Sequence, residues 1–352
     1  MNIFELLKLT LKRDASDLHL TPGCSAVLRV HGHLVPVNGK KLSADDVREM
    51  VFPVLSPHQK QRLEEKRSVD LSYLLRDIGR FRINVYYQRG EISAAFRRLY
   101  DKIFSIDELG LPQGLAQLAD LRDGLVLVTG PTGCGKSTTL ATIIDLINQT
   151  RSVHIITIED PIEYFHQHKQ SIVTQRELYV DIHSFAEAMR DSLREDPDVI
   201  FVGEMRDIDT MRSAITAAET GHLVFSTLHT RDTVSSISRI LGVFPSVEQQ
   251  YIRQQLSDVL KAVVSQRLLT CSCGTRRRPS VEIMKVTKGI SNLIRLGKTE
   301  QIYSSIETGA SLGMQTMEQS LVNLLRQGHI DKQTAFKMAK SVELIKQRTY
   351  ML

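Results

Sequence analysis

The sequence of 352 residues contains no tryptophan and no long apolar segment. None of its apolar runs approaches the roughly 18 residues that a membrane-spanning helix needs, so we expect only peripheral association with a membrane. The first residues, Met1 to Leu9, include an early acidic residue and lack the basic start and long apolar stretch of a secretory signal. These absences predict a protein of the cytoplasm.

Cysteine, aromatic residues and excess charge are also scarce. The four cysteines are at positions 24, 134, 271 and 273, and Cys271 and Cys273 have neither the spacing nor the second pair of a zinc site. We therefore expect reduced thiols. The net charge of +5 is small for this length, and aromatic residues make up 6%. A nucleic-acid translocase needs a basic channel with aromatic side chains, so we expect no nucleic-acid partner.

The length suffices for two domains, each with its own core. We expect residues 1–99 to form a small α+β domain with an antiparallel sheet and helices on one face. Its predicted helices are Ile3–Lys12 and a stretch from Ser43 to Lys66 that is interrupted at Pro53 and Pro57. Its predicted strands are Ser16–Leu20, Ala26–Val30, Val69–Leu75, Arg80–Tyr87 and Ile92–Leu99.

Residues 100–112 contain Gly110-Leu111-Pro112 and are the predicted linker. From residue 113 to 352, apolar strands alternate with amphipathic helices, which indicates an α/β domain with a parallel sheet. The predicted strands are Leu125–Thr129, Val153–Ile158, Val199–Val202 and His222–Leu228, with helices over Ser184–Arg194 and Asp207–Thr220.

The last hundred residues read as helices. Ser246 and Gln249 have the spacing of a capping box, which predicts a helix from there to about Leu269. A loop is expected at residues 276–279. Further helices are predicted over Ser291–Leu296, Gln315–Gln327 and Asp331–Lys340.

A glycine-rich stretch after the first of these α/β strands carries the clearest chemistry. Residues 130–138 read Gly-Pro-Thr-Gly-Cys-Gly-Lys-Ser-Thr and match the P-loop pattern, between an apolar strand and a helix. Glycines let backbone N–H groups surround phosphates, and the helix N-terminus adds its positive dipole end. We expect nucleotide binding by Gly130, Pro131, Thr132, Gly133, Cys134, Gly135, Lys136, Ser137 and Thr138. Lys136 would contact the β- and γ-phosphates of ATP, and Ser137 would bind Mg²⁺.

Carboxylates follow two of the predicted strands. Glu204 ends the strand Val199–Val202 in the manner of a Walker B segment and is a candidate for holding Mg²⁺ through water or polarising the attacking water. Glu163 follows the strand that ends at Ile158, and the residues alone leave open whether it is a general base or part of a turn at Pro161.

Three further side chains are candidates whose residue pattern leaves a structural alternative. His229 follows the strand that ends at Leu228 and could sense the γ-phosphate, although a single histidine there is often structural. Arg82 and Arg97 alternate along the last two strands of the first domain. They could supply cations to the γ-phosphate or could simply face solvent.

Five ordered motifs resemble the type II/IV secretion ATPases, most closely the subgroup of type IV pilus retraction ATPases. They are the Walker A stretch at 130–138, Ile-Glu-Asp-Pro-Ile-Glu-Tyr at 158–164, Leu-Arg-Glu-Asp-Pro-Asp-Val-Ile at 193–200, Gly-Glu-Met-Arg-Asp at 203–207 and Thr-Leu-His-Thr at 227–230. The resemblance extends from Ala15 to Thr316. It implies a PAS-like N-terminal domain, a RecA-like ATPase domain and a homohexameric ring.

The resemblance also implies roles and partners. It makes Glu204, Glu163, His229, Arg82 and Arg97 catalytic, with Mg·ATP held between the domains. The implied partner is the inner-membrane pilus platform protein, at the cytoplasmic face of that membrane, with a paralogous retraction ATPase as a second partner. The implied output is pilus retraction and twitching motility.

Departures from the family pattern keep other functions open. The chain lacks the tetracysteine zinc site of extension ATPases. Gly-Ile-Ser-Asn-Leu-Ile-Arg-Leu at 289–296 lacks the first Arg and the final Glu of the helix motif associated with retraction. The alternatives are an accessory retraction ATPase, a motor of a related type II secretion system, and a module that binds ATP with negligible turnover.

Overall fold

The computed structural model describes residues 2–30, 32–37, 39–75, 78–99, 102–274 and 276–350, without the side chains of residues 349 and 350. The predicted linker begins at Tyr100 and Asp101, which lie outside the described residues. The chain forms two compact units. The first comprises residues 1–102 and 161–165, and the second comprises residues 103–160 and 166–352.

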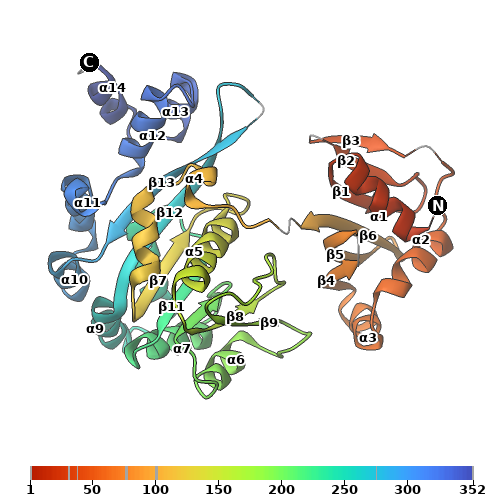
Figure 1. Ribbon diagram of the computed structural model, residues 1–352, viewed down its shortest axis with the longest axis horizontal. Coiled ribbons are helices and arrows are strands. Elements are labelled where there is room, and N and C mark those ends of the chain that lie inside the picture. Colours follow the sequence, from red (N-terminus) through yellow and green to blue (C-terminus); the bar gives the residue numbers. More distant parts are fainter. Residues whose placement is uncertain are drawn as a thin grey trace. The chain divides into compact units, whose positions relative to one another are not determined.

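The first unit is a six-stranded antiparallel sheet in the order β3-β2-β1-β6-β5-β4, as predicted for an α+β domain. Its strands are β1 (Ala15–Leu20), β2 (Val27–Val30), β3 (His33–Pro36), β4 (Ser68–Leu75), β5 (Gly79–Gln88) and β6 (Glu91–Leu99). The sequence did not indicate β3, an exposed edge strand of four residues. Helices α1 (Ile3–Lys12), α2 (Ala44–Val51) and α3 (Pro57–Lys66) bury Leu7, Val47 and Leu63 in one apolar core with the strands (Figure 1).

The second unit contains a seven-stranded sheet in the order β13-β12-β7-β11-β10-β8-β9. Six strands run parallel to one another: β7 (Gly124–Thr129), β8 (His154–Glu159), β9 (Ile172–Glu177), β10 (Val199–Val202), β11 (Leu223–Leu228) and β12 (Leu260–Thr270). Only β13 (Arg277–Lys285), at one edge of this sheet in the described residues, runs antiparallel. The predicted parallel α/β sheet is confirmed, with an antiparallel edge strand added.

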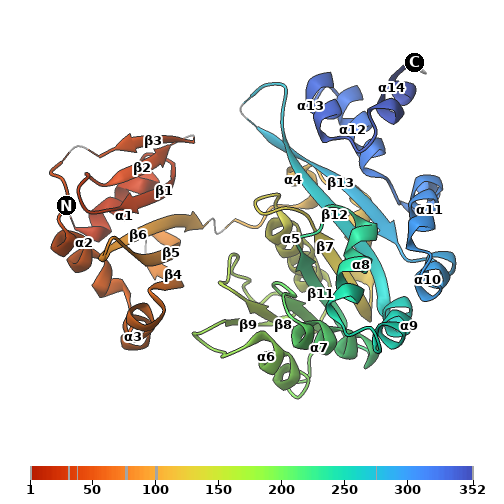
Figure 2. The ribbon, with the colours of Figure 1, turned by 180° about the vertical axis from the view of Figure 1, so that it is seen from behind.

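Helices cover both faces of this sheet because alternate residues of its strands point to opposite sides. Leu125 and Leu127 of β7 lie in one core with α6 (Phe185–Ser192), α7 (Ile208–Glu219), α8 (Thr233–Val243) and α9 (Gln249–Val259). Val126 and Val128 lie in the other core with α5 (Lys136–Thr150) and the 3₁₀ segment Gln113–Asp120. Figure 2 shows α8 on the face opposite to α5. The P-loop strand is thus buried in the middle of the sheet.

The prediction of one helix from Ser246 to Leu269 is wrong. The helix α9 begins at Gln249 with Glu248 as its N-cap, without a capping side chain, and ends at Val259, where the chain becomes the buried strand β12. The expected loop at 276–279 is also wrong for residues 277–279, which belong to β13. Pro279 is tolerated there because β13 is an edge strand.

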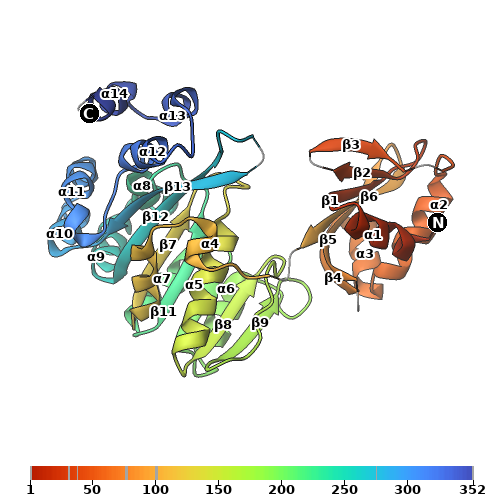
Figure 3. The ribbon, with the colours of Figure 1, turned by 45° about the horizontal axis from the view of Figure 1, so that its top comes forward.

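In the described part of the chain, five further α-helices follow β13, and the short α4 (Ile106–Leu109) precedes β7. The five are α10 (Lys288–Arg295), α11 (Ile302–Thr308), α12 (Met317–Arg326), α13 (Lys332–Met338) and α14 (Val342–Tyr350). Helices α12 to α14 lie together beside β13 (Figure 3) and bury Leu321, Ile330 and Ile345 in a separate small core. This C-terminal group is therefore attached to the sheet through its edge.

Candidate functional site

The P-loop connects β7 to α5, as the sequence predicts, and Lys136 is the first residue of α5. Its side chain turns back into the loop, where Nζ donates to the carbonyl oxygens of Gly130 at 2.8 Å and Pro131 at 3.2 Å. Lys136 is only 8% exposed. A buried ammonium group held by the loop's own carbonyls marks the place where a phosphate would supply stronger, charge-assisted partners.

Two glycines of the P-loop have a positive φ and also lie too close to Gln266 for a Cβ to fit without a shift. Gly130 has φ 142°, and a Cβ there would lie 2.3 Å from the carbonyl oxygen of Gln266. Gly135 has φ 92°, and a Cβ there would lie 2.9 Å from Nε2 of Gln266. The loop therefore approaches β12 too closely for any side chain at Gly130.

Gln266 is a site residue that the sequence analysis missed. It is buried on β12, donates from Nε2 to the carbonyl oxygen of Cys134 at 2.7 Å, and accepts from the hydroxyl of Thr139 at 2.8 Å. These bonds fix the P-loop to the neighbouring strand and to the first turns of α5. The sequence offered little signal, because Gln266 lies between Ser265 and Arg267 in a stretch that was read as part of a helix.

Three predicted residues meet at the carboxyl ends of β7, β10 and β11. Nε2 of His229 lies 3.2 Å from Oε1 of Glu204, and Nδ1 of His229 lies 3.5 Å from Nζ of Lys136. The hydroxyl of Thr227 donates to the carbonyl oxygen of Gly203 at 2.6 Å, which joins the ends of β11 and β10. The imidazole is thus positioned between the P-loop lysine and the Walker B carboxylate.

Arg206 is the second partner of this carboxylate. Its Nε and Nη2 atoms each lie 2.8 Å from Oε2 of Glu204, so the guanidinium group holds one oxygen of the carboxylate while His229 faces the other. Arg206 also lies 3.9 Å from Asp160. Because the side chain of Glu204 is 20% exposed, it remains open to water.

A cavity of about 480 Å³ opens beside the P-loop. Gly135, Thr138 and Gln266 line it on the loop side, and Leu111 and Arg278 contribute to its other walls. Its apolar surface and cationic rim suit the base and sugar of a nucleotide better than a purely polar ligand. The larger cavity of about 630 Å³ lies between α12 and β13 and contains none of the predicted site residues.

The other predicted catalytic residues belong to the first unit. Glu163 lies in the segment 161–165, which is held by a buried arginine, Arg80. This side chain donates to the carbonyl oxygens of Ile162 at 2.5 Å and Glu163 at 3.3 Å, and its guanidinium lies 3.5 Å from the ring centroid of Phe165. Lys136, Glu204 and His229 all belong to the second unit.

Arg82 and Arg97 are directly opposite each other on β5 and β6. Each has an acidic partner within the first unit: Arg82 lies 3.4 Å from Asp70, and Arg97 donates to Asp17 at 2.9 Å. Burial acts to raise the pKa of Asp17, but hydrogen bonds from Ser16 and Arg97 outweigh it and lower that pKa. Arg97 is therefore also a structural partner of a buried carboxylate.

The residues proposed for Mg²⁺ offer oxygen atoms. Ser137 is half-buried at the second position of α5, and Glu204 supplies a carboxylate. Among the described residues, no group of three or more His, Cys, Asp or Glu side chains forms a ready metal site. Mg²⁺ is usually held by one or two protein oxygens and completes its shell with phosphates and water. No helix among the described residues is long and apolar enough to cross a membrane.

Three relatives match nearly the whole chain. The type IV pilus retraction ATPase PilT of Pseudomonas aeruginosa is 45% identical over 343 residues, which cover 97% of this chain and 99% of the relative. A twitching motility protein of Neisseria gonorrhoeae is 46% identical over 97% of this chain and 91% of the relative. The type IV pilus ATPase PilU of P. aeruginosa is 39% identical over 97% and 89%.

A solved structure and a family model agree with these relatives. The crystal structure of the pilus retraction motor PilT with bound ADP superposes with a TM-score of 0.92 at 45% identity, over 99% of both chains. The model of the family described as type II/IV secretion system protein matches residues 2–345. The resemblance seen in the five motifs is confirmed, and the chain belongs to the type II/IV secretion system protein family.

Proposed function

We propose that this chain is an ATP-hydrolysing motor subunit that drives retraction of a type IV pilus. The observation that carries the proposal is the contact of His229 with both Lys136 and Glu204 at the ends of three adjacent strands. This arrangement joins a phosphate-binding lysine to a carboxylate that is open to water. It fits phosphoryl transfer to water, in which catalysis consists mainly of positioning and charge stabilisation.

The residues of the second unit have defined tasks in this proposal. Lys136 exchanges the carbonyl oxygens of Gly130 and Pro131 for the β- and γ-phosphates of ATP, at the N-terminus of α5. Glu204 polarises the attacking water. His229 touches both groups and reports the state of the γ-phosphate to Glu204. Ser137 and Glu204 would hold Mg²⁺, which neutralises charge that develops on the phosphates.

The residues of the first unit supply the remaining charges. Glu163 is proposed as the general base, and Arg82 and Arg97 as cations for the γ-phosphate, which they would reach by domain closure on the nucleotide. Closure would free both arginines from Asp70 and Asp17. Sequential closure in six copies of the chain would turn a ring against its partner.

The pilus assignment rests on the relatives. The chain is 45% identical to a pilus retraction ATPase over almost its full length, which favours the same cargo. The proposed partners are five further copies of this chain and the inner-membrane platform protein of the pilus, at the cytoplasmic face of the membrane, with a paralogous retraction ATPase as a second partner.

An accessory role is the second candidate, and α10 favours it. The family motif associated with retraction has an Arg and a final Glu, where this chain has Ser291 and Leu296. Leu296 is 58% exposed, so a polar end of the motif is replaced by an apolar surface. The 39% identity to PilU is in keeping with such a role.

Two measurements separate these functions. Purified chain should hydrolyse ATP, and Glu204→Gln should bind ATP without turnover. In bacteria that lack their own retraction ATPase, expression of the chain should restore twitching motility. The accessory role would be favoured if the chain hydrolyses ATP but restores motility only when a retraction ATPase is co-expressed with it. No hydrolysis in the unsubstituted chain would overturn both.

A further inference from the structure

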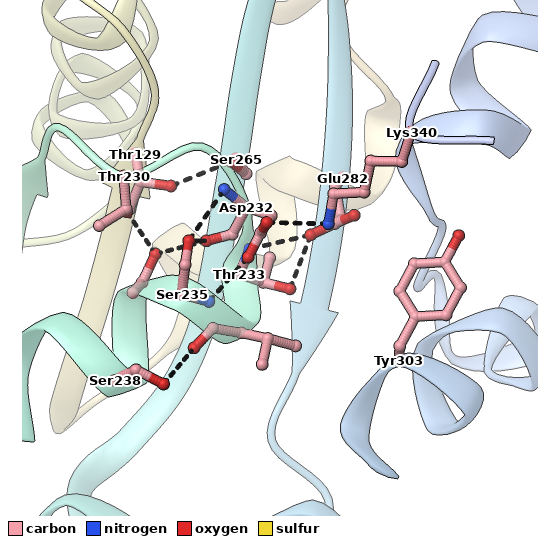
Figure 4. Close-up of polar contacts among 12 residues, drawn as sticks. Thr129, Thr230, Asp232, Thr233, Ser235, Ser238, Ser265, Glu282, Tyr303 and Lys340 are labelled. Carbon is pink, nitrogen blue, oxygen red and sulfur yellow. Dashed lines mark hydrogen bonds and ion pairs between the residues drawn. The ribbon is translucent and has the colours of Figure 1, made fainter. Parts of the chain in front are cut away.

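The loop that carries His229 is held at its far end by contacts outside the nucleotide site. Three residues after His229 the chain enters α8, whose N-cap is Asp232. Oδ2 of Asp232 lies 2.8 Å from Nζ of Lys340, and Thr233 donates from both its backbone N–H and its hydroxyl to Oε1 of Glu282 at 2.8 Å (Figure 4). Neither Lys340 nor Glu282 belongs to a motif of the nucleotide site.

Asp232 joins two functions in one side chain. Its Oδ1 accepts from the backbone N–H of Ser235 at 2.7 Å and so caps α8. Its other oxygen faces Lys340. Burial acts to raise the pKa of Asp232, but the hydrogen bonds from Lys340 and Ser235 lower it overall, so the carboxylate is charged at neutral pH. The loop after β11 therefore ends at a carboxylate that is held in place by Lys340 and Ser235.

Glu282 belongs to a row of polar side chains that crosses three strands. Thr129, Ser265 and Glu282 are directly opposite one another on β7, β12 and β13, and the hydroxyl of Thr129 donates to that of Ser265 at 3.1 Å (Figure 4). Thr129 is the residue before the P-loop. Glu282 is 1% exposed, and its Oε2 has no hydrogen-bond partner among the residues that the structure describes. Two hydrogen bonds from Thr233 compensate Oε1 of this buried side chain for its loss of contact with water.

Lys340 is held by the C-terminal helices. It lies between α13 and α14, and its backbone N–H donates to Oε1 of Glu318 on α12 at 3.0 Å. The other oxygen of Glu318 accepts from the hydroxyl of Tyr303 at 2.7 Å, and the ammonium group of Lys340 lies 5.7 Å from the ring centroid of Tyr303. The position of Lys340 is therefore set by α11 and α12, which pack beside the sheet edge.

We propose that Lys340 is a positioning residue for ATP hydrolysis, acting through Asp232 on the loop that carries His229. Asp232 lies three residues from His229, at most about 11 Å of chain at 3.8 Å per residue. Such a short loop fixed at both ends has little freedom, so a shift of Asp232 moves the imidazole relative to Lys136 and Glu204. The C-terminal helices would thereby set the rate of turnover through the position of the His229 imidazole.

The inference rests on the proposed ATPase function, and full-length chain tests it. Lys340→Ala should lower kcat for ATP about tenfold, because a small misplacement of a positioned group is costly. The KM for ATP should change less than about twofold, since Lys136 and the loop glycines are untouched. Lys340→Arg, which keeps the charge, should retain most of the turnover. Lys337→Ala, an exposed lysine on α13, is the matched control.

A second variant guards against a purely structural effect. Asp232→Asn keeps an N-cap as good as Asp but removes the ion pair, so it should reproduce the loss of kcat. The double variant Asp232→Asn/Lys340→Ala should be no slower than either single variant, because both remove one interaction. Melting temperature and mass in solution are recorded for every variant.

The outcomes separate the inference from the function on which it rests. Equal kcat in Lys340→Ala and Lys337→Ala overturns the inference and leaves the ATPase intact. The inference is also overturned if the losses of kcat in Asp232→Asn and Lys340→Ala add up in the double variant. It is overturned as well if kcat falls only in variants that no longer assemble. No turnover in the unsubstituted chain overturns the proposed function and the inference together.

Discussion

Nε2 of His229 lies 3.2 Å from Oε1 of Glu204, although 25 residues separate them in the chain. The contact exists because parallel pairing of β10 with β11 brings the carboxyl ends of both strands to one edge of the sheet. Strand β11 lies between β10 and β7, and the P-loop follows β7. Lys136 of the P-loop therefore lies at the same edge, beside His229. The sheet order thus creates the site.

Lys136→Ala should weaken ATP binding by about a hundredfold, because it removes a charge-assisted contact to the phosphates. Titration with a fluorescent ATP analogue measures this. Lys288→Ala, an exposed lysine at the start of α10, should bind as the unsubstituted chain does. Unchanged affinity in Lys136→Ala would remove the P-loop assignment.

Glu204→Gln should keep ATP affinity within about threefold and lower kcat by about a hundredfold or more, because an amide cannot polarise the water in the same way. Single-turnover hydrolysis distinguishes this from slow product release. Glu300→Gln changes an exposed carboxylate of the same type and serves as the control. Undiminished turnover in Glu204→Gln would show that another residue polarises the attacking water.

Arg82→Gln should lower kcat by about tenfold or more with little change in melting temperature, because its partner Asp70 is half-exposed. Arg97→Gln should lower both kcat and the melting temperature, since it removes one of the two side-chain hydrogen bonds that the described residues make to the buried Asp17 and leaves only the bond from Ser16. Arg89→Gln, at an exposed turn of the first unit, is the comparison. If Arg82→Gln hydrolyses ATP at the full rate, that arginine has no part in catalysis.

Asp145 on α5 predicts a pH dependence of stability. Burial acts to raise its pKa, but the nearby imidazole of His166 and the hydrogen bonds from Lys169 and Gln149 outweigh burial and place the pKa at about 2. A pKa below the unfolded value stabilises the fold above pH about 4, and this contribution of about 2 kcal/mol is lost as the pH falls toward 2.

Asp145→Asn should therefore melt well below the unsubstituted chain at pH 7, and the difference should narrow as the pH falls below about 4. Thermal unfolding at a series of pH values measures it, with Asp120→Asn, an exposed site, as the control. A difference that stays constant with pH would show that the ionised carboxylate adds no stability.

The nucleotide site was largely predictable because its signals are local. The P-loop requires glycines and a lysine at fixed spacing, and Glu204 and His229 each follow a short apolar strand. Glu163 was proposed from a motif, and Arg82 and Arg97 were proposed from their alternation along two strands and from the family resemblance. The roles proposed for all three depend on domain closure, which the sequence pattern does not encode.

The region after Val243 was harder because its boundaries lack sequence signals. Val259 and Leu260 separate α9 from β12 without a glycine or proline, so the apolar pattern of the strand reads as a continued helix. The strand is decided by pairing with β7, a contact between residues 135 or 136 positions apart. Gln266 and Glu282 were missed for the same reason, because their roles exist only across strands.

The most direct test of a ring motor is the rate of ATP hydrolysis per subunit against protein concentration, with mass measured by light scattering on the same samples. We predict a rate that rises as the mass approaches that of a hexamer, because closure in one subunit depends on its neighbours. A constant rate from a monomer would contradict the ring and leave a simple ATPase. ATP binding without hydrolysis at any concentration would contradict the motor itself.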